Sequence, residues 1–414
     1  MKSEWKVVIL KDIIEFNPRE SIKKASIAKK IPMEALSPLQ RKIEFVKIEN
    51  FTGGVKFRNG DTLMARITPS LENGKTAFVD VLNEDEVAFG STEFFVLRAK
   101  QDKILPKYLY YISISNDLRN RAIKSMTGTS GRQRAQKESI LDYEIFLPRL
   151  DLQKKIVSIL DSLDSKIELN NQMIATLEEL ASTLFKRWFV DFEFPDENGN
   201  PYKTSGGKMD ESEFGEIPEG WEVGKLSDIG EIIGGGTPSK KKEEYFKEGT
   251  ISWITPKDLS EKKNVFISHG KTNITNLGLS KSSARLIPAK SVLFSSRAPI
   301  GYIAIASKEV STNQGFKSVV PKEINQSEFV YLLLKNKVTD IESRATGSTF
   351  KEVSGSIMKN LPVIIPDSKS INFFCNVVKC WFSQIENLEQ ENDSLNDTRN
   401  ILLPRLLSGE YEVV

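Results

Sequence analysis

The sequence predicts an α+β protein built as a tandem repeat, in which each repeat is a mixed head followed by a long helix. Three observations lead to this prediction. A pattern of residues at the start of the chain returns near residue 221, short strand-like runs fill the first part of each repeat, and a long apolar heptad pattern ends each repeat. Such self-similarity over a fixed offset is the signature of a duplicated unit.

The repeat is visible in matching residues that keep their order and a nearly constant offset. Trp5, Val7, Leu10, Asp12, Ile13 and Glu15 recur as Trp221, Val223, Leu226, Asp228, Ile229 and Glu231. Leu63, Met64, Arg66 and Pro69 recur as Leu293, Phe294, Arg297 and Pro299, Ser91 and Thr92 as Ser311 and Thr312, and Thr127, Gly128 and Ser130 as Thr346, Gly347 and Ser348. We infer a tandem duplication with its boundary near residue 217.

Each head combines short strands with one helical stretch. In the first half the strand-like runs are 43–48, 62–67, 76–81, 94–97 and 143–147, with a helical pattern over 106–124. The second half repeats this with runs at 251–254, 291–294, 302–305 and 362–365 and a helix near 328–344. Strands of this length, interrupted by one helix per head, are typical of an α+β fold.

A heptad seam follows each head. Residues that are apolar at all but three positions alternate steps of four and three. They are Ile156, Leu160, Leu163, Ile167, Asn170, Ile174, Leu177, Ala181, Leu184 and Trp188, and again Phe374, Val378, Trp381, Ile385, Leu388, Asn392, Leu395, Arg399, Leu402 and Leu406. A helix packed on its own head would explain apolar residues, but so long and narrow a stripe favours a coiled coil. Pro404 should kink or end the second helix.

Composition places the protein among ordinary soluble globular chains. Of 414 residues, 39% are hydrophobic and 28% charged, and the net charge is +2, so any DNA surface must come from local clusters of basic side chains. Two cysteines exclude a disulfide framework and favour a reducing compartment. The apolar run Val7 to Leu10 is too short for a signal peptide or membrane span, so we expect a cytoplasmic protein without a membrane partner.

No catalytic centre, cofactor site or metal site is recognisable. One histidine, His269, and two cysteines cannot assemble a zinc site of the usual types. No phosphate-binding GxxxxGK[ST] loop exists, and Gly234 to Pro238 lacks the order of a dinucleotide-binding turn. Asp196, Glu197 and Lys203 could suggest a nuclease core, but they lie in a polar linker. The sequence therefore predicts a protein without an active site.

The strongest local charge signal lies at the end of the first helical stretch. Basic residues without an intervening acid alternate there with hydroxyl and amide side chains that can contact phosphates or bases. The candidate DNA-binding residues of the first head are Arg66, Arg119, Arg121, Lys124, Thr127, Ser130, Arg132, Arg134 and Lys137. Those of the second head are Lys240, Lys241, Arg297, Thr346, Ser348, Thr349 and Lys351. The alternative is a solvated helix end with a mobile polar loop.

The duplication separates two kinds of candidate. Features common to both heads, such as the Thr-Gly-x-Ser loop and the arginines Arg66 and Arg297, should support the fold or contact phosphates. Residues that differ, such as Arg132 and Arg134 against Thr349 and Phe350, are better candidates for base choice. Two heads that read different bases must diverge where bases are read.

Three segments resemble the specificity subunits of type I restriction–modification systems. They are 184–192 (LFKRWFVDF), 216–221 (EIPEGW) and 402–410 (LLPRLLSGE), and the order of head and helix over the whole length is also similar. The resemblance implies target-recognition domains at 1–150 and 218–367, long helices at 151–192 and 368–414 that pair antiparallel as a coiled coil, and a linker at 193–217. Arg399, a charged seam residue, departs from that pattern.

The resemblance also implies function and partners. Each target-recognition domain would read one half of a split, asymmetric site in double-stranded DNA. Two modification subunits, which methylate adenine, and restriction subunits would assemble on this chain and would bind the S-adenosylmethionine, ATP and Mg²⁺ that it lacks. Two alternatives remain, an adaptor whose heads bind protein and a stand-alone DNA-modifying enzyme, the latter opposed by the missing cofactor motifs.

The repeat geometry adds one further prediction about the helices. Residue i of the first helix maps onto i+218 of the second, so an antiparallel pair would place Asn170 opposite a residue near 390. Asn170 and Asn392 are then the polar seam residues closest to the crossing. A polar residue in an apolar seam lowers stability but fixes register, so we predict that these two asparagines set the register of the pair.

Overall fold

The computed structural model describes residues 5–347 and 351–411. It divides into two compact units, each containing one head and part of both long helices. Unit 1 comprises Met1–Leu169 and Asn392–Val414, and unit 2 comprises Asn170–Glu391. Ser348 and Thr349, two of the candidate DNA-binding residues, and Phe350 lie outside the described residues.

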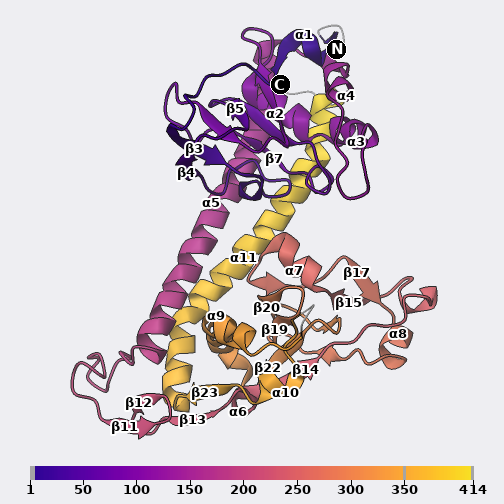
Figure 1. The fold of residues 1–414 in the computed structure, drawn as a ribbon. Helices are drawn as coiled ribbons and strands as arrows, with labels where there is room; N and C mark the ends of the chain where they lie inside the picture. The colour runs from indigo at the N-terminus through magenta and orange to yellow at the C-terminus, as the bar shows by residue number, and fades with distance from the viewer. Residues whose placement is uncertain (1–4, 348–350, 412–414) are drawn as a thin grey trace. The chain divides into compact units, whose positions relative to one another are not determined.

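Head 1 (residues 5–149) contains two four-stranded sheets and a two-stranded sheet (Figure 1). The orders are β2-β9-β6-β7, β4-β3-β8-β5 and β1-β10. The strands are β1 Lys6–Ile9, β2 Ile14–Phe16, β3 Ile27–Ile31, β4 Lys47–Asn50, β5 Val55–Phe57, β6 Thr62–Ala65, β7 Thr76–Phe78, β8 Ala88–Gly90, β9 Phe94–Ala99 and β10 Glu144–Leu147. Every residue of β6 and β7 is buried, which explains their continuous apolar runs in place of an alternating pattern.

Head 2 (residues 219–367) repeats this topology with one added strand. Its sheets are β14-β22-β19-β20-β16, β17-β15-β21-β18 and β13-β23. The strands are β13 Glu222–Lys225, β14 Gly230–Gly234, β15 Ile251–Ile254, β16 Phe266–Ile267, β17 Thr272–Ile274, β18 Leu286–Ile287, β19 Val292–Ser296, β20 Ile300–Ala306, β21 Val310–Thr312, β22 Lys317–Pro321 and β23 Pro362–Ile365. Both heads hold a parallel pair at the same place, β3 with β8 and β15 with β21, and the added strand β16 of head 2 forms a second parallel pair with β20. The matching sheet orders confirm the α+β heads and their duplication.

The helices of the heads correspond only in part, because two α-helices between β15 and β18 of head 2 have no α-helical counterpart among the described residues of head 1. Head 1 has α1 Leu10–Ile13, α2 Pro106–Ile114, α3 Asn116–Lys124 and α4 Lys137–Leu141, and head 2 has α6 Leu226–Ile229, α7 Pro256–Lys262, α8 Asn276–Ser280, α9 Ser327–Ser343 and α10 Gly355–Lys359. The helix predicted over 106–124 is interrupted at Ser115. Its hydroxyl accepts a hydrogen bond from the backbone N–H of Leu118 at 3.4 Å and so caps a second helix.

Two 40-residue helices follow the heads, α5 Leu150–Phe189 and α11 Ser368–Leu407. Every residue of both predicted seams is buried or partly buried, so the seam prediction is confirmed. Pro404 does not end α11, which continues three residues further to Leu407. A proline in the last turn removes only one of the final backbone hydrogen bonds, and this small loss is tolerated there.

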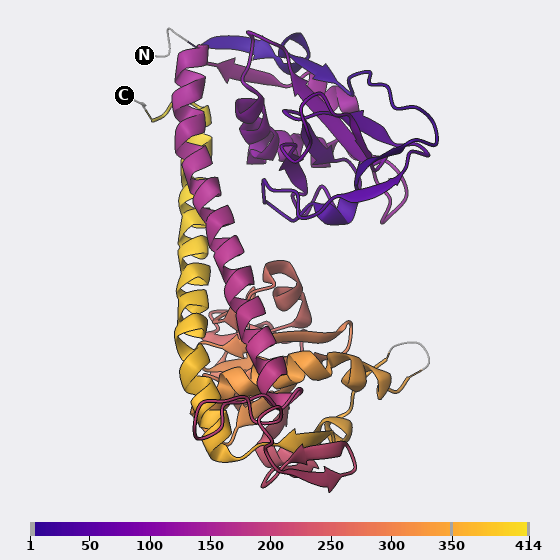
Figure 2. The same cartoon turned by 90° about the vertical axis from the view of Figure 1, so that its left-hand side faces the viewer.

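Within each unit the two helices run antiparallel (Figure 2). In unit 1, Asp164 of α5 pairs with Arg399 of α11. In unit 2, Asn170 of α5 contacts Glu391 of α11, and Trp188 packs against Phe373. Trp188 lies eighteen residues after Asn170, whereas Phe373 lies eighteen residues before Glu391. One helix therefore advances as the other recedes, residue for residue, which confirms the predicted antiparallel coiled coil.

The polar segment between α5 and head 2 is not entirely irregular. It contains a two-stranded antiparallel hairpin, β11 Met209–Ser212 with β12 Gly215–Pro218. Phe194, near its start, stacks on Trp221 with ring centroids 5.0 Å apart, which attaches the segment to head 2. No helix within residues 5–347 and 351–411 is long and apolar enough to cross a membrane.

Candidate nucleic-acid interface

The basic segment of head 1 consists of α3, a projecting loop over residues 125–136 and the start of α4. The loop begins and ends as a hairpin. The backbone N–H of Thr127 donates to Arg134 at 3.1 Å, and that of Arg134 donates back to Thr127 at 2.9 Å. Gly128 and Gly131 have φ of +126° and +78°, a region that favours glycine, and they form the tight reversal between the paired ends. The turn therefore presents residues 128–132 to solvent.

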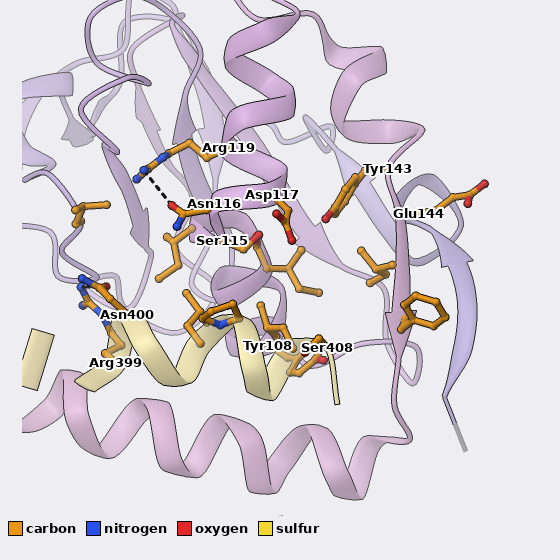
Figure 3. Close-up of a pocket in the computed structure, with 18 residues that line it drawn as sticks. Tyr108, Ser115, Asn116, Asp117, Arg119, Tyr143, Glu144, Arg399, Asn400 and Ser408 are labelled. Atoms are coloured by element: carbon orange, nitrogen blue, oxygen red, sulfur yellow. Dashed lines mark hydrogen bonds between the residues drawn. The ribbon is translucent and has the colours of Figure 1, made fainter. Parts of the chain in front are cut away.

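Two of the candidate arginines bind within the protein. Arg121 donates from Nε to the carbonyl of Ser139 at 2.8 Å and from Nη2 to that of Asp142 at 3.3 Å, so it fastens α3 to the end of α4. Arg119 donates to the side chain of Asn116 at 3.2 Å at the edge of a pocket in unit 1 (Figure 3). Both side chains thus have structural partners.

Other basic residues around the loop are free to bind a partner. The side chains of Lys124 and Arg132 are exposed and form no hydrogen bond or ion pair within the described part of the chain, although the backbone N–H of Arg132 donates to Thr129 at 3.0 Å. Lys137 lies 3.7 Å from Glu138 in a pair whose side chains are both 61% exposed, a contact that contributes little to stability. Thr127 and Ser130 are exposed as well. The loop thus offers at least one free guanidinium next to hydroxyl groups, a combination suited to phosphate and base contacts.

Arg134 differs from Arg132, its neighbour in the loop. Its guanidinium binds Glu93 in a two-pronged pair, with Nε–Oε1 at 3.0 Å and Nη2–Oε1 at 2.6 Å. The hydrogen bond and the charge of Glu93 raise the pKa of Arg134 above its ordinary value. The sequence around the loop does not reveal that Arg134 is paired and Arg132 is not, because Glu93 lies 41 residues away along the chain.

The equivalent loop of head 2 joins α9 to α10. Thr346 and Glu352 pair through two backbone hydrogen bonds of 3.0 and 2.9 Å, as Thr127 and Arg134 do. Lys351 is exposed. Lys240 and Lys241 are exposed too, but they precede the short 3₁₀ helix 243–245 and belong to a different part of the head.

The proposed equivalence of Arg66 and Arg297 is wrong by one residue. Backbone hydrogen bonds from Ala135 to Arg66 at 2.8 Å and from Val353 to Ser296 at 3.0 Å align Arg66 with Ser296. The cis prolines Pro69 and Pro299 give the same alignment. The guanidinium of Arg66 lies 4.8 Å from the centre of the Phe95 ring, whereas Arg297 binds Glu352 at 3.1 Å. The two arginines therefore have different roles.

The residue-by-residue comparison of the two loops is corrected by the same backbone hydrogen bonds. The hairpin closures align Arg134 with Glu352, not with Phe350, so the two heads carry opposite charges at this position. Sequence matching missed the pair because it followed residue type, and the loop of head 2 is one residue shorter between its closing residues.

Asp196 and His269, two residue types that often serve in catalysis, have ordinary structural contacts. Asp196 accepts backbone hydrogen bonds from Asn198 and Asn200, both at 2.8 Å, and so stabilises a turn of the linker. His269 is exposed and contacts Ser268. Among the described residues no group of three or more His, Cys, Asp and Glu side chains is arranged to hold a metal ion.

Comparison with known proteins identifies the family. The model of the type I restriction modification DNA specificity domain matches residues 2–179 and 218–374, which include most of both heads and parts of both long helices. The chain belongs to this family. As a type I specificity subunit it recognises DNA sequence, has no catalytic role and carries no cofactor of its own.

Individual relatives agree with this assignment. The HindI specificity subunit of Haemophilus influenzae is 29% identical over 89% of this chain and 90% of its own length. The MjaIX specificity subunit of Methanocaldococcus jannaschii is 41% identical over 45% of this chain and 43% of its own. The crystal structure of a type I S subunit from M. genitalium covers 99% of this chain and 97% of its own with a TM-score of 0.54 and 14% identity, a likeness of fold alone.

Proposed function

We propose that this specificity subunit reads a bipartite, asymmetric site in double-stranded DNA, one half-site with each head. The carrying observation is that the two heads share one topology and one loop closure but differ in the residues of that loop. A common scaffold with different reading residues is what recognition of two different half-sites requires. Arg132 is the residue that we propose to contact a base in head 1, and Lys351 supplies a cation in head 2.

We propose that the other candidate residues divide between phosphate contact and support of the fold. Lys124, Lys137, Lys240 and Lys241 are exposed cations that can contact phosphates without reading bases. The exposed hydroxyls of Thr127, Ser130 and Thr346 can donate to phosphates or bases. Arg121 joins α3 to the end of α4, whereas Arg119 binds Asn116 within α3 itself.

The chain would also act as a scaffold for two modification subunits, with restriction subunits joining that core. S-adenosylmethionine, ATP and Mg²⁺ would bind to those partners. The firm attachment of each head to the helices of its own unit supports this role. Arg41 of head 1 binds Asp161 and Glu168 of α5, the latter at 2.7 Å, and Lys290 of head 2 binds Glu386 of α11 at 3.4 Å.

The purified chain should neither methylate nor cut DNA, and adding the modification subunits with S-adenosylmethionine should produce adenine methylation at one split sequence. Mapping methylated adenines would give that sequence. Replacing head 2 with the corresponding head of another specificity subunit should then change one half-site and leave the other unchanged. Methylation by the homogeneous chain alone, or a change in both half-sites, would contradict the proposal.

We propose further that Asn170 and Asn392 fix the register of the helices. Both are at least nine-tenths buried, and Asn170 donates from Nδ2 to Glu391, the residue before Asn392, at 2.8 Å. Replacing both asparagines with leucine should raise thermal stability while broadening the range of accepted spacer lengths between half-sites. A double variant that keeps one sharp spacer preference would refute this role.

A further inference from the structure

The bases of the two recognition loops can be aligned residue by residue. The backbone N–H of Arg66 donates to Glu93 at 2.9 Å in head 1, and that of Ser296 donates to Gly315 at 2.7 Å in head 2. Together with the loop closures this aligns Glu93 with Gly315 and Phe95 with Lys317. The ionic contacts at the two loop bases can therefore be compared position by position.

Both loop bases contain an ion pair, but its polarity is reversed. In head 1 the last hairpin residue is the cation Arg134, and its partner is the anion Glu93. In head 2 the last hairpin residue is the anion Glu352, which lies 3.1 Å from Arg297 and 3.5 Å from Lys317. In head 1 the partner lies directly before β9, and in head 2 the partners lie in β22, the equivalent of β9, and directly after β19. Each loop is therefore tied at its base to the sheet of its own head.

We propose that Arg134 and Glu352 are positioning residues, which hold the recognition loops against the sheets and act on DNA only through the residues that the loops present. The inference rests on the proposed role of these loops in reading DNA. It assigns different duties to Arg132 and Arg134, two arginines that the sequence alone treats as equivalent.

The reversed polarity is the main argument. A carboxylate repels DNA phosphates, so the position of Glu352 does not serve phosphate contact in head 2. A tie to the sheet requires only opposite charges, and either polarity satisfies it. In head 1 both Nε and Nη2 of Arg134 already donate to Glu93. The guanidinium would have to leave Glu93 before these two nitrogens could donate to a phosphate.

Removing Glu93 distinguishes positioning from direct contact. If Arg134 contacted DNA, Glu93→Gln would free a cation and remove a repelling charge, and binding would tighten. If the pair positions the loop, Glu93→Gln and Arg134→Gln should both weaken binding to the methylation-mapped target, by about threefold to fivefold. The assay uses the complex with modification subunits, and exchange of the first half-site for random sequence measures discrimination.

Salt dependence and rescue provide the second and third readouts. Arg132→Gln removes the cation proposed to contact a base, so it should lower discrimination at the first half-site and reduce the slope of log affinity against log salt by up to about 0.9, the value for one neutralised phosphate. Arg134→Gln should leave the slope unchanged. The double variant Glu93→Arg with Arg134→Glu, which copies the polarity of head 2, should recover affinity to within about twofold of the native complex, a smaller loss than either single variant shows. Lys11→Gln, which breaks an exposed pair with Asp142 in the same head, is the matched control and should change neither quantity.

Hydrogen exchange verifies that the loop itself responds. The amides of Thr127 and Arg134 should exchange faster in both single variants, while those of β6 keep their protection. Tighter binding in Glu93→Gln, a lower salt slope in Arg134→Gln or a failure of the double variant to recover would overturn the inference. A native complex without any preference at the first half-site would instead overturn the proposed function.

Discussion

A buried ion pair joins the two long helices in unit 1. Nη1 of Arg399 lies 2.8 Å from Oδ1 of Asp164, and the two side chains are only 4% and 3% exposed. The hydroxyl of Tyr111, from α2, donates to the other carboxylate oxygen at 2.9 Å. The charged seam residue that departs from the family pattern is therefore neutralised by a partner on the facing helix.

Replacing Arg399 with methionine should destabilise unit 1 strongly. The change leaves Asp164 as a buried charge without a cation, and breaking such a pair costs about 3–5 kcal/mol. Replacing Asp164 with leucine and Tyr111 with phenylalanine in the same chain removes the whole polar group. Buried pairs exchanged for apolar residues are often neutral or stabilising, so this triple variant should return to within about 1 kcal/mol of the native protein.

Hydrogen exchange at increasing urea concentration suits this measurement. Four of the five tryptophans lie in unit 2, so intrinsic fluorescence would report mainly on that unit. Opening free energies from peptides of α2 and α3 report on unit 1 directly. Lys11→Met, which breaks a pair about half exposed on both sides, is the control and should cost less than about 1 kcal/mol. A loss below about 1 kcal/mol in Arg399→Met, or a triple variant as unstable as the single one, would refute the reasoning.

Three further predictions concern individual groups. Burial raises the pKa of Cys375 to about 12, whereas Cys380 is exposed, so a thiol reagent near pH 8 should label one cysteine rapidly in the native chain, and Cys380→Ser should remove that fast phase. Burial raises the pKa values of Tyr108, Tyr110 and Tyr111, so these hydroxyls lose their protons at lower pH in the unfolded chain than in the folded one. The free energy of unfolding, measured with urea, should therefore be unaffected by these groups below about pH 10. Above that pH it should fall by up to about 1.4 kcal/mol per tyrosine and pH unit. Ser115→Ala should cost unit 1 about 1 kcal/mol in the same assay, because the N-cap of α3 is lost.

The fold was predictable because its signals are local. The buried runs at 62–65 and 76–78 and the helical periodicity of 156–188 follow from neighbouring residues, and the duplication confirmed each assignment a second time. The interruption at Ser115 was missed, although Ser115-Asn116-Asp117 is a typical helix start and was present in the sequence.

The candidate interface was less predictable because its contacts join distant segments. Matching by residue type paired Ser91 and Thr92 with Ser311 and Thr312, but the backbone aligns Ser91 with Asn313. The two side chains accept equivalent hydrogen bonds, Ser91 from the N–H of Glu93 at 3.1 Å and Asn313 from that of Gly315 at 2.9 Å. Residue identity changed while the interaction persisted, and only sheet register reveals that correspondence.

The attachment of the heads to the helices extends the same rule. Glu386 lies 218 residues after Glu168, the offset of the helix repeat, and each glutamate binds a cation of the head in its own unit. The head supplies Arg41 in one case and Lys290 in the other. Both helices thus carry a glutamate at the equivalent position, and each head supplies a different basic residue to pair with it. A head that offers a cation at this place can therefore be exchanged without redesign of the helix, while its recognition loop remains free to change, provided that the charges at the loop base change together.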